Sequence, residues 1–295
     1  MTTATTSKPG SQSNSLRLVC SEVWGGNRPI RIPIELPGVR GQLYSQPCDG
    51  GRGGDVHYLS VCGSGLLSRI CIADVAGHGE TIAKVSGEIL ALLRRYMNQT
   101  DQRRVLSDLN RRLEQSDTAA MTTAAALTYY PPSRSLSISY AGHPPAWLYS
   151  QSTRRWSQLS IRSAGPGLID MPLAVSPDTT YSRHTEHVEF GDRLLLLTDG
   201  VLEAPAADGA LYGEERLSGL LNAHADDPPH ELVDLILSAL MEFTHDAALK
   251  HDDVTLLLIE FVPGPRGPSP WHALKNRILR PRGNGQTFYG RIAQA

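Results

Sequence analysis

Cysteine and long hydrophobic runs are scarce in this sequence. Four of its 295 residues are cysteine (Cys20, Cys48, Cys62 and Cys71), with no Cys-x-x-Cys pair and no zinc-site spacing with histidine. An even count permits two disulfides, but we favour reduced, partly buried thiols. No run of about 18 apolar residues exists to span a membrane, and the polar N-terminus has no signal-peptide pattern. These absences predict a soluble, cytoplasmic protein.

A strong net charge is also lacking. The chain has 28 Lys and Arg against 30 Asp and Glu, a net charge of −2. Residues 262–295 hold six basic and no acidic residues, so the first 261 residues carry −8. An acidic body gives no attraction for nucleic acid and is compatible with binding cations. The sequence therefore predicts neither a nucleic-acid nor a membrane partner.

Composition divides the chain into three parts. Residues 1–18 are small and polar and are predicted to be disordered. Residues 263–295 are basic and rich in proline and glycine, which predicts a tail outside the core. Residues 19–262 are left as the folded domain, where the Gly/Pro-rich stretch 18–48 is expected to supply one strand and loops.

Hydrophobic periodicity predicts strands, then helices, then strands again. Strands are expected at 56–61, 68–73, 122–130, 136–140, 147–149, 184–190, 193–198 and 254–261. One helix is expected at 80–98 and a second directly after Asp101, which can cap it. Two more are expected at 213–223 and 229–245. This order predicts an α+β fold, a β-sandwich of two antiparallel sheets flanked by helical pairs.

Aspartates stand beside glycine or another turn signal at four predicted strand ends. The four motifs are Gly53-Gly54-Asp55, Asp74-Val75-Ala76-Gly77-His78-Gly79, Thr198-Asp199-Gly200 and Asp252-Asp253-Val254-Thr255. Each alone is an ordinary turn signal and would more often be structural. Their combination is harder to explain by turn chemistry, because a sandwich could bring all four together.

Carboxylates at strand ends suit hard divalent cations. Mg²⁺ and Mn²⁺ prefer oxygen ligands, and flanking glycines let the backbone approach them closely. Four such aspartates could hold two ions about 3.5–4 Å apart, with a water between them whose pKa is lowered. That arrangement predicts attack by a metal-activated water on a phosphoryl group.

The ordered set of motifs, together with Ala141-Gly142-His143, resembles the PPM-type (type 2C) metal-dependent protein phosphatases, and among them the bacterial SpoIIE-like branch. The resemblance extends from Glu22 to Phe261. It implies a PPM-type β-sandwich, a catalytic domain over residues 19–262, and two divalent cations, Mn²⁺ or Mg²⁺. It also implies direct attack of a metal-bound water on phosphorus, without a phosphoenzyme.

The resemblance also implies roles for individual residues. Asp74 would bridge both metals, with Asp74 and Asp199 as the central catalytic residues. The second metal would take the Val75 carbonyl and, mostly through water, Asp55. The first would take Asp199 and Asp252, with Asp253 as the alternative ligand. Arg52 is the candidate for binding the substrate phosphate, and the supporting positions are Gly54, Gly77, His78, Gly79, Gly200 and Thr255.

Some positions depart from the family pattern. Ala76 stands where eukaryotic members carry a histidine that is a candidate general acid, and His78 lies two residues further on. The loop 165–175 resembles the substrate-side loop, yet Asp170 and Ala174 depart from its Leu-Pro-Leu-Gly form. Neither the general acid nor substrate selection is therefore assigned.

The resemblance implies a protein serine/threonine phosphatase acting in signal transduction on a phosphorylated regulatory protein, such as an anti-sigma-factor antagonist. A homodimer and a regulatory movement of the helices over 80–115 are further expectations. One alternative is a catalytically silent binding module with the same fold, although retention of all the ligand aspartates argues against it. Another is a metal-dependent phosphodiesterase, for which the expected His-Asp metal motifs are missing.

Overall fold

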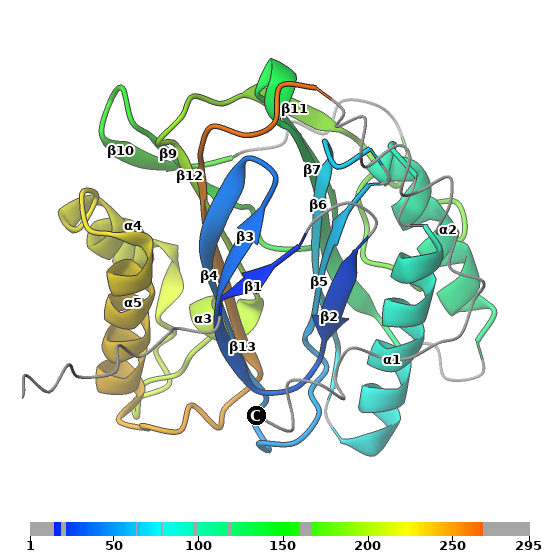
Figure 1. The fold of residues 1–295 in the computed structure, drawn as a ribbon. Coiled ribbons are helices and arrows are strands. Elements are labelled where there is room, and N and C mark those ends of the chain that lie inside the picture. Colours follow the sequence, from blue (N-terminus) through cyan, green and yellow to red (C-terminus); the bar gives the residue numbers. More distant parts are fainter. Residues whose placement is uncertain are drawn as a thin grey trace, which may run out of the picture.

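The protein is a sandwich of two β-sheets with helices on both outer faces (Figure 1). The computed structural model describes residues 15–18, 22–62, 64–77, 79–96, 99–116, 120–159 and 167–267. All strand pairs are antiparallel except β1 with β3, which run parallel. The predicted fold class is therefore confirmed.

One sheet has seven strands and the other has six. In spatial order, the seven-stranded sheet consists of β1 (Leu16–Arg17), β3 (Ile30–Leu36), β4 (Val39–Gln46), β13 (Val254–Phe261), β12 (Arg193–Leu197), β9 (Trp147–Ser150) and β10 (Arg155–Gln158). The six-stranded sheet consists of β11 (His184–His187), β8 (Ser135–Ala141), β7 (Thr122–Tyr130), β6 (Ser68–Val75), β5 (Val56–Val61) and β2 (Val23–Gly26). The two sheets interleave along the chain, so each contains early and late segments.

Four of the five described α-helices form two pairs, one on each side of the sandwich, while the remaining short helix follows β12. The helices are α1 (Glu80–Arg95), α2 (Gln102–Glu114), α3 (Asp199–Leu202), α4 (Gly213–Ala223) and α5 (Pro229–Thr244), with a 3₁₀ turn at Pro131–Ser133. Figure 1 shows α1 and α2 on the outer face of the six-stranded sheet, and α4 and α5 on that of the seven-stranded sheet. Asp101 caps α2 by accepting from the Arg103 N–H, as its sequence position predicted.

Three hydrophobic layers hold these elements together. The central layer fills the space between the sheets, and each outer layer joins one sheet to its helical pair. On α1 the buried apolar positions include Val85, Ile89 and Leu93, at the spacing that predicted this helix. Burial at a helical period explains why these outer elements form helices and do not join the sheets.

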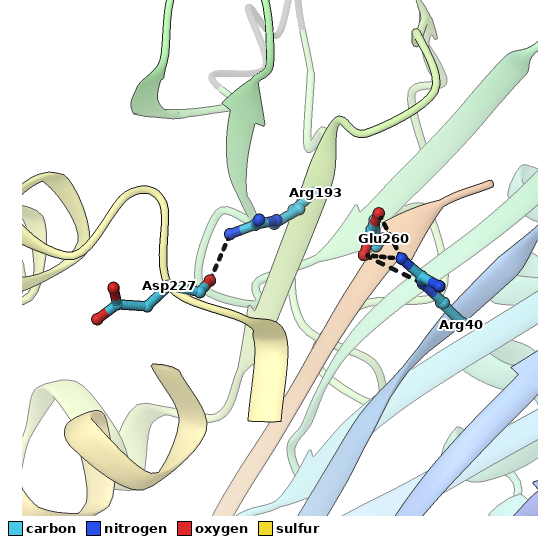
Figure 2. Close-up of polar contacts among 4 residues, drawn as sticks. All are labelled: Arg40, Arg193, Asp227 and Glu260. Atoms are coloured by element: carbon cyan, nitrogen blue, oxygen red, sulfur yellow. Dashed lines mark hydrogen bonds and ion pairs between the residues drawn. The ribbon is translucent and has the colours of Figure 1, made fainter. Parts of the chain in front are cut away.

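Two arginines stabilise the seven-stranded sheet, Arg193 against the α4–α5 connection and Arg40 within the sheet (Figure 2). Arg193 on β12 donates to the carbonyl oxygens of Asp227 at 2.7 Å and Ala225 at 3.1 Å, which fixes the α4–α5 connection against the sheet. Arg40 on β4 donates to Glu260 on β13, the residue directly opposite in the ladder. These contacts stabilise the end of the sheet opposite to the strand ends that carry the aspartates.

The N-terminal region contains more regular structure than predicted. The stretch expected to give one strand and loops instead contains β2, β3 and β4, of which β4 pairs with β13 along its full length. Pro37 and Gly38, the latter at φ +75°, turn β3 into β4 and hid the hairpin among loop signals. The boundary expected at residue 18 is also wrong, because Leu16–Arg17 pair with β3 and Leu18 is buried.

Other boundaries differ by a few residues. Strand β6 continues to Val75, β11 ends at His187, and α1 ends at Arg95. Residues 63, 78, 97 and 98, which the sequence predictions included, lie outside the described residues, as does Cys20.

The three described cysteines, Cys48, Cys62 and Cys71, are free. No helix in the described ranges is both long and apolar enough to cross a bilayer.

Candidate metal centre

The predicted aspartates lie at neighbouring strand ends on both sheets. Asp55 directly precedes β5, and the pairing of Val56 with Ala73 places it across from Asp74 on β6. Asp199 begins α3, separated from the end of β12 only by Thr198, while Asp252 precedes β13, the partner of β12. Two carboxylates therefore come from the six-stranded sheet and two from the seven-stranded sheet.

Asp55 connects the two sheets through a threonine. Its Oδ2 accepts a 2.8 Å hydrogen bond from the Thr198 hydroxyl, which in turn accepts from the Thr255 N–H at 3.0 Å. Thr198 and Thr255 are fully buried, and Asp55 is only 2% exposed. The Oδ1 of Asp55 is buried without a hydrogen-bond partner in the described structure. An unpaired buried carboxylate oxygen is costly unless a cation or proton satisfies it.

Burial and mutual repulsion raise the pKa values of these carboxyls. The pKa of Asp55 is well above its ordinary value, first because of burial and then because of Asp74. Burial, followed by the charges of Asp199 and Asp252, raises the pKa of Asp74 to about 7. The pKa of Asp199 is raised by burial, Asp252 and Glu203. Acidic groups that disfavour one another's ionisation in this way are well placed to bind a cation.

Asp252 and Asp253 occupy different environments, although either could be the ligand from sequence. Asp253 is 5% exposed, and its two oxygens accept from the backbone N–H groups of Cys48, at 2.8 Å, and Asp55, at 3.1 Å. It therefore fixes the loop that carries Asp55. Asp252 accepts a hydrogen bond from the N–H of the next residue, Asp253, and its charge raises the pKa of Asp74 and Asp199. This difference favours Asp252 as the ligand and a structural role for Asp253.

Asp253→Ala is accordingly expected to lower the free energy of unfolding by about 2–6 kcal/mol, because it leaves unpaired one buried and one partly buried N–H donor, at about 1–3 kcal/mol each. Asp252→Asn is expected to leave stability unchanged or increased, because it removes one of several repelling charges. Urea denaturation of both metal-free variants measures the difference. Equal losses of stability in the two variants would contradict the separate roles.

Two glycines allow the motif loops to approach each other. A Cβ on Gly54 would lie 2.5 Å from the Val75 carbonyl oxygen, and one on Gly200 would lie 2.0 Å from the Asp253 carbonyl oxygen. Both distances are far below van der Waals contact, so these positions require glycine. The Gly54 contact places the Val75 carbonyl beside the Asp55 loop, and its role as a ligand of the second metal stays a prediction. His251 bonds the Gly200 carbonyl at 2.7 Å through Nε2 and so holds the opposite loop.

Several supporting residues were not found by sequence reasoning. The Asn27 side chain donates to the Gly53 carbonyl, and the Ser86 hydroxyl on α1 reaches the carbonyls of Gly53 and Gly54, all at 3.1 Å. One sequence signal could have identified Ser86: it is a polar residue among the apolar positions that form the buried face of α1. Glu203, which follows α3, is a further acidic group that raises the pKa of Asp74 and Asp199.

Arg52 lies beside the candidate centre and not within it. It is exposed and lines an open cavity of about 280 Å³ with Asp49, Gly79, Glu80 and Lys84. A phosphate-binding role for Arg52 stays a prediction. His78 lies outside the described residues. In the predicted substrate-side loop, Ala174 adopts φ +62°, the left-handed conformation that explains why the related pattern has glycine at this position.

The donor set fits hard divalent cations. It consists of carboxylate oxygens and one backbone carbonyl, with an unpaired Asp55 oxygen and mutually repelling neighbours. Among the described residues, however, no three His, Cys, Asp or Glu side chains already surround a common point as ligands of one ion. Closure of these carboxylates on a cation therefore belongs to the proposal made below.

Comparison with solved structures defines the fold class. The RsbU and RsbW domains of a Mycobacterium tuberculosis protein match with a TM-score of 0.64 and 22% identity, over 83% of this chain and 64% of that one. The PP2C domain of SiaA from Pseudomonas aeruginosa matches with a TM-score of 0.62 and 19% identity, over 74% and 85%. The sandwich thus has the fold of PP2C-type phosphatase domains.

Sequence comparison then gives the family. The model of the Stage II sporulation protein E (SpoIIE) family matches residues 67–262, more than half of the chain, so this chain belongs to that family. The phosphoserine phosphatase RsbU of Bacillus subtilis (strain 168) is 30% identical over 197 residues, which are 65% of this chain and 55% of RsbU. The chain thus corresponds to about half the length of this relative.

Proposed function

We propose that this protein is a metal-dependent protein serine/threonine phosphatase. The observation that carries the proposal is the placement of Asp55, Asp74, Asp199 and Asp252 at neighbouring strand ends of two facing sheets, with a buried Asp55 oxygen left unpaired. Membership of the SpoIIE family, in which divalent-metal dependence is implied, supports the same conclusion. The relative RsbU is named a phosphoserine phosphatase.

The proposed ligands are those suggested by the motifs. Asp74 would serve both cations, Asp199 and Asp252 the first, and the Val75 carbonyl and Asp55 the second. Bound Mn²⁺ or Mg²⁺ would supply a nucleophilic water at neutral pH and offset charge on the phosphoryl oxygens. Thr198 fixes the orientation of Asp55 by donating to its Oδ2, and Asp253 fixes its backbone.

The proposed substrate is phosphoserine or phosphothreonine on a regulatory protein, such as an anti-sigma-factor antagonist. Support comes from RsbU and from the RsbU and RsbW domains of the M. tuberculosis protein, to which this chain is similar. We place the activity in the cytoplasm as part of this proposal, because the protein kinases that would make such substrates use cytoplasmic ATP. Arg52, at the rim of the centre, is the proposed contact for the phosphate or its flanking residues.

Phosphate release from a phosphoserine peptide tests the activity. The wild-type protein should release phosphate with Mn²⁺, should not do so with excess chelator, and should leave a phosphodiester such as bis(p-nitrophenyl) phosphate largely intact. Asp226→Asn, which alters an exposed carboxylate on the α4–α5 connection, is the control and should retain activity. Peptide binding without any metal-dependent release would favour the silent binding module, and faster cleavage of the diester would favour a phosphodiesterase.

A further inference from the structure

His143 lies buried between the two sheets, close to the candidate centre. It follows β8 and Gly142, whose φ of +63° turns the chain inward, and it is 6% exposed. Gly142 forms a parallel bridge with Ala124 on β7, which fixes the position of the turn. The motif Ala141-Gly142-His143 thus places an imidazole inside the fold, although it supplies none of the carboxylates described above.

One side of the imidazole contacts the six-stranded sheet. Its Nδ1 lies 2.9 Å from the Thr123 hydroxyl oxygen on β7. Thr123 is the residue directly opposite Asp74 in the β6–β7 ladder. Opposed residues of antiparallel strands point to the same face with Cβ atoms about 4.5–5.5 Å apart. The Thr123 side chain therefore lies between His143 and the carboxylate proposed to serve both cations.

The other side of the imidazole faces the seven-stranded sheet. On that side the backbone of Leu197, the last residue of β12 and two residues before Asp199, acts on the pKa of the ring. Nε2 is buried and has no hydrogen-bond partner among the described residues. Burial lowers the pKa of His143 to about 3, and the Leu197 backbone opposes that effect in part. A neutral ring suits this burial, because its Nδ1 can then accept from the Thr123 hydroxyl.

We propose that His143 is a positioning residue that orients Asp74 through its contact with Thr123, the residue opposite Asp74 in the β6–β7 ladder. The proposal rests on the proposed function, since it assigns His143 and Thr123 to the support of that metal centre. Groups that orient ligands without touching the metal typically change its affinity by about 10–100-fold when removed. His143 and Thr123 are predicted to act through the same hydrogen bond and so to be coupled.

Calorimetric titration of the metal-free protein with Mn²⁺ tests this assignment without relying on activity. His143→Ala and Thr123→Val should each weaken Mn²⁺ binding by at least about tenfold. Thr123→Ser keeps the hydroxyl and should bind as the wild type does. The double variant should bind little more weakly than either single variant, because both remove one interaction. Thr185→Val, the same change on the far edge strand β11 of this sheet, is the matched control.

The variants separate a positioning role from a structural one. Thermal unfolding of each metal-free variant reports the structural cost, and Thr123→Val with Thr123→Ser preserves the test if His143→Ala does not fold. Wild-type Mn²⁺ affinity in a folded His143→Ala or Thr123→Val protein would overturn the proposal, as would equal weakening by Thr123→Ser. If the wild-type protein itself took up no Mn²⁺, the proposed function would fail first, which is a different result.

Discussion

Asp74→Asn is expected to remove nearly all phosphatase turnover and, at the same time, to make the metal-free protein more stable. Asp74 is the carboxylate proposed to serve both cations, so its loss should reduce turnover by at least about a hundredfold. In the metal-free protein the same carboxylate is buried among like charges, which raises its pKa to about 7 from an ordinary 3.8. A shift of this size corresponds to a destabilisation on the order of 2–4 kcal/mol at neutral pH, which asparagine would relieve.

Two measurements check the opposite signs of these effects. Phosphate release from a phosphoserine peptide at saturating Mn²⁺ gives turnover, and urea denaturation in chelator gives the free energy of unfolding. Asp199→Asn should behave in the same direction with a smaller gain of stability, because fewer charges act on Asp199. Asp226→Asn should change neither quantity appreciably. Wild-type turnover in Asp74→Asn at saturating Mn²⁺ would refute the assignment of this residue.

The second large effect is a dependence of metal-free stability on pH. Between pH 3.8 and about 7 the folded protein keeps a proton on Asp74 that the unfolded chain has lost. The folded state therefore binds more protons, so the free energy of unfolding contributed by this group falls as pH rises through that window. The raised pKa of Asp55 and Asp199 adds to the decline. Over the window, Asp74 alone should account for on the order of 2–4 kcal/mol.

Divalent metal should reverse this dependence. A bound cation favours the ionised carboxylates, so binding releases protons and strengthens as pH rises. Urea denaturation between pH 4.5 and 8, in chelator and in excess Mg²⁺, measures both slopes. Exposed acids such as Asp101 and Asp246 have lowered pKa values and contribute in the opposite direction, so the informative quantity is the difference from Asp74→Asn. Identical pH profiles for the wild type and this variant would contradict the account.

The fold and the motif positions could be predicted because their signals are local. Strands β5, β7 and β13 and helix α4 are read from alternation or helical spacing within a single segment, and they begin and end where predicted. Each motif aspartate likewise lies at a strand end that its neighbouring residues predict. The hairpin of β3 and β4 was missed because β4 is a strand through its pairing with β13, about 200 residues away, while its own composition is typical of a loop.

The separate roles of the residues in the centre could not be predicted either, because they also depend on contacts between distant parts of the chain. Asp252 and Asp253 are equivalent in sequence, and only the contacts of Asp253 with Cys48 and Asp55 separate them. The link from Thr198 to Asp55 joins residues 143 positions apart. Roles set by tertiary neighbours require the fold, whereas the choice of oxygen ligands at strand ends requires only the residue types and their order.

The most direct test of the central claim is a crystal of this protein soaked in Mn²⁺, with anomalous diffraction used to locate the metal. Two manganese peaks are expected among the strand ends, with Asp74 contacting both, Asp199 and Asp252 contacting one, and the Val75 carbonyl the other. Asp253 should remain bonded to the backbone. The account would be contradicted if the side chains of these four aspartates were ordered and well separated, with no manganese among them. This holds whether the crystal binds the ion elsewhere or not at all.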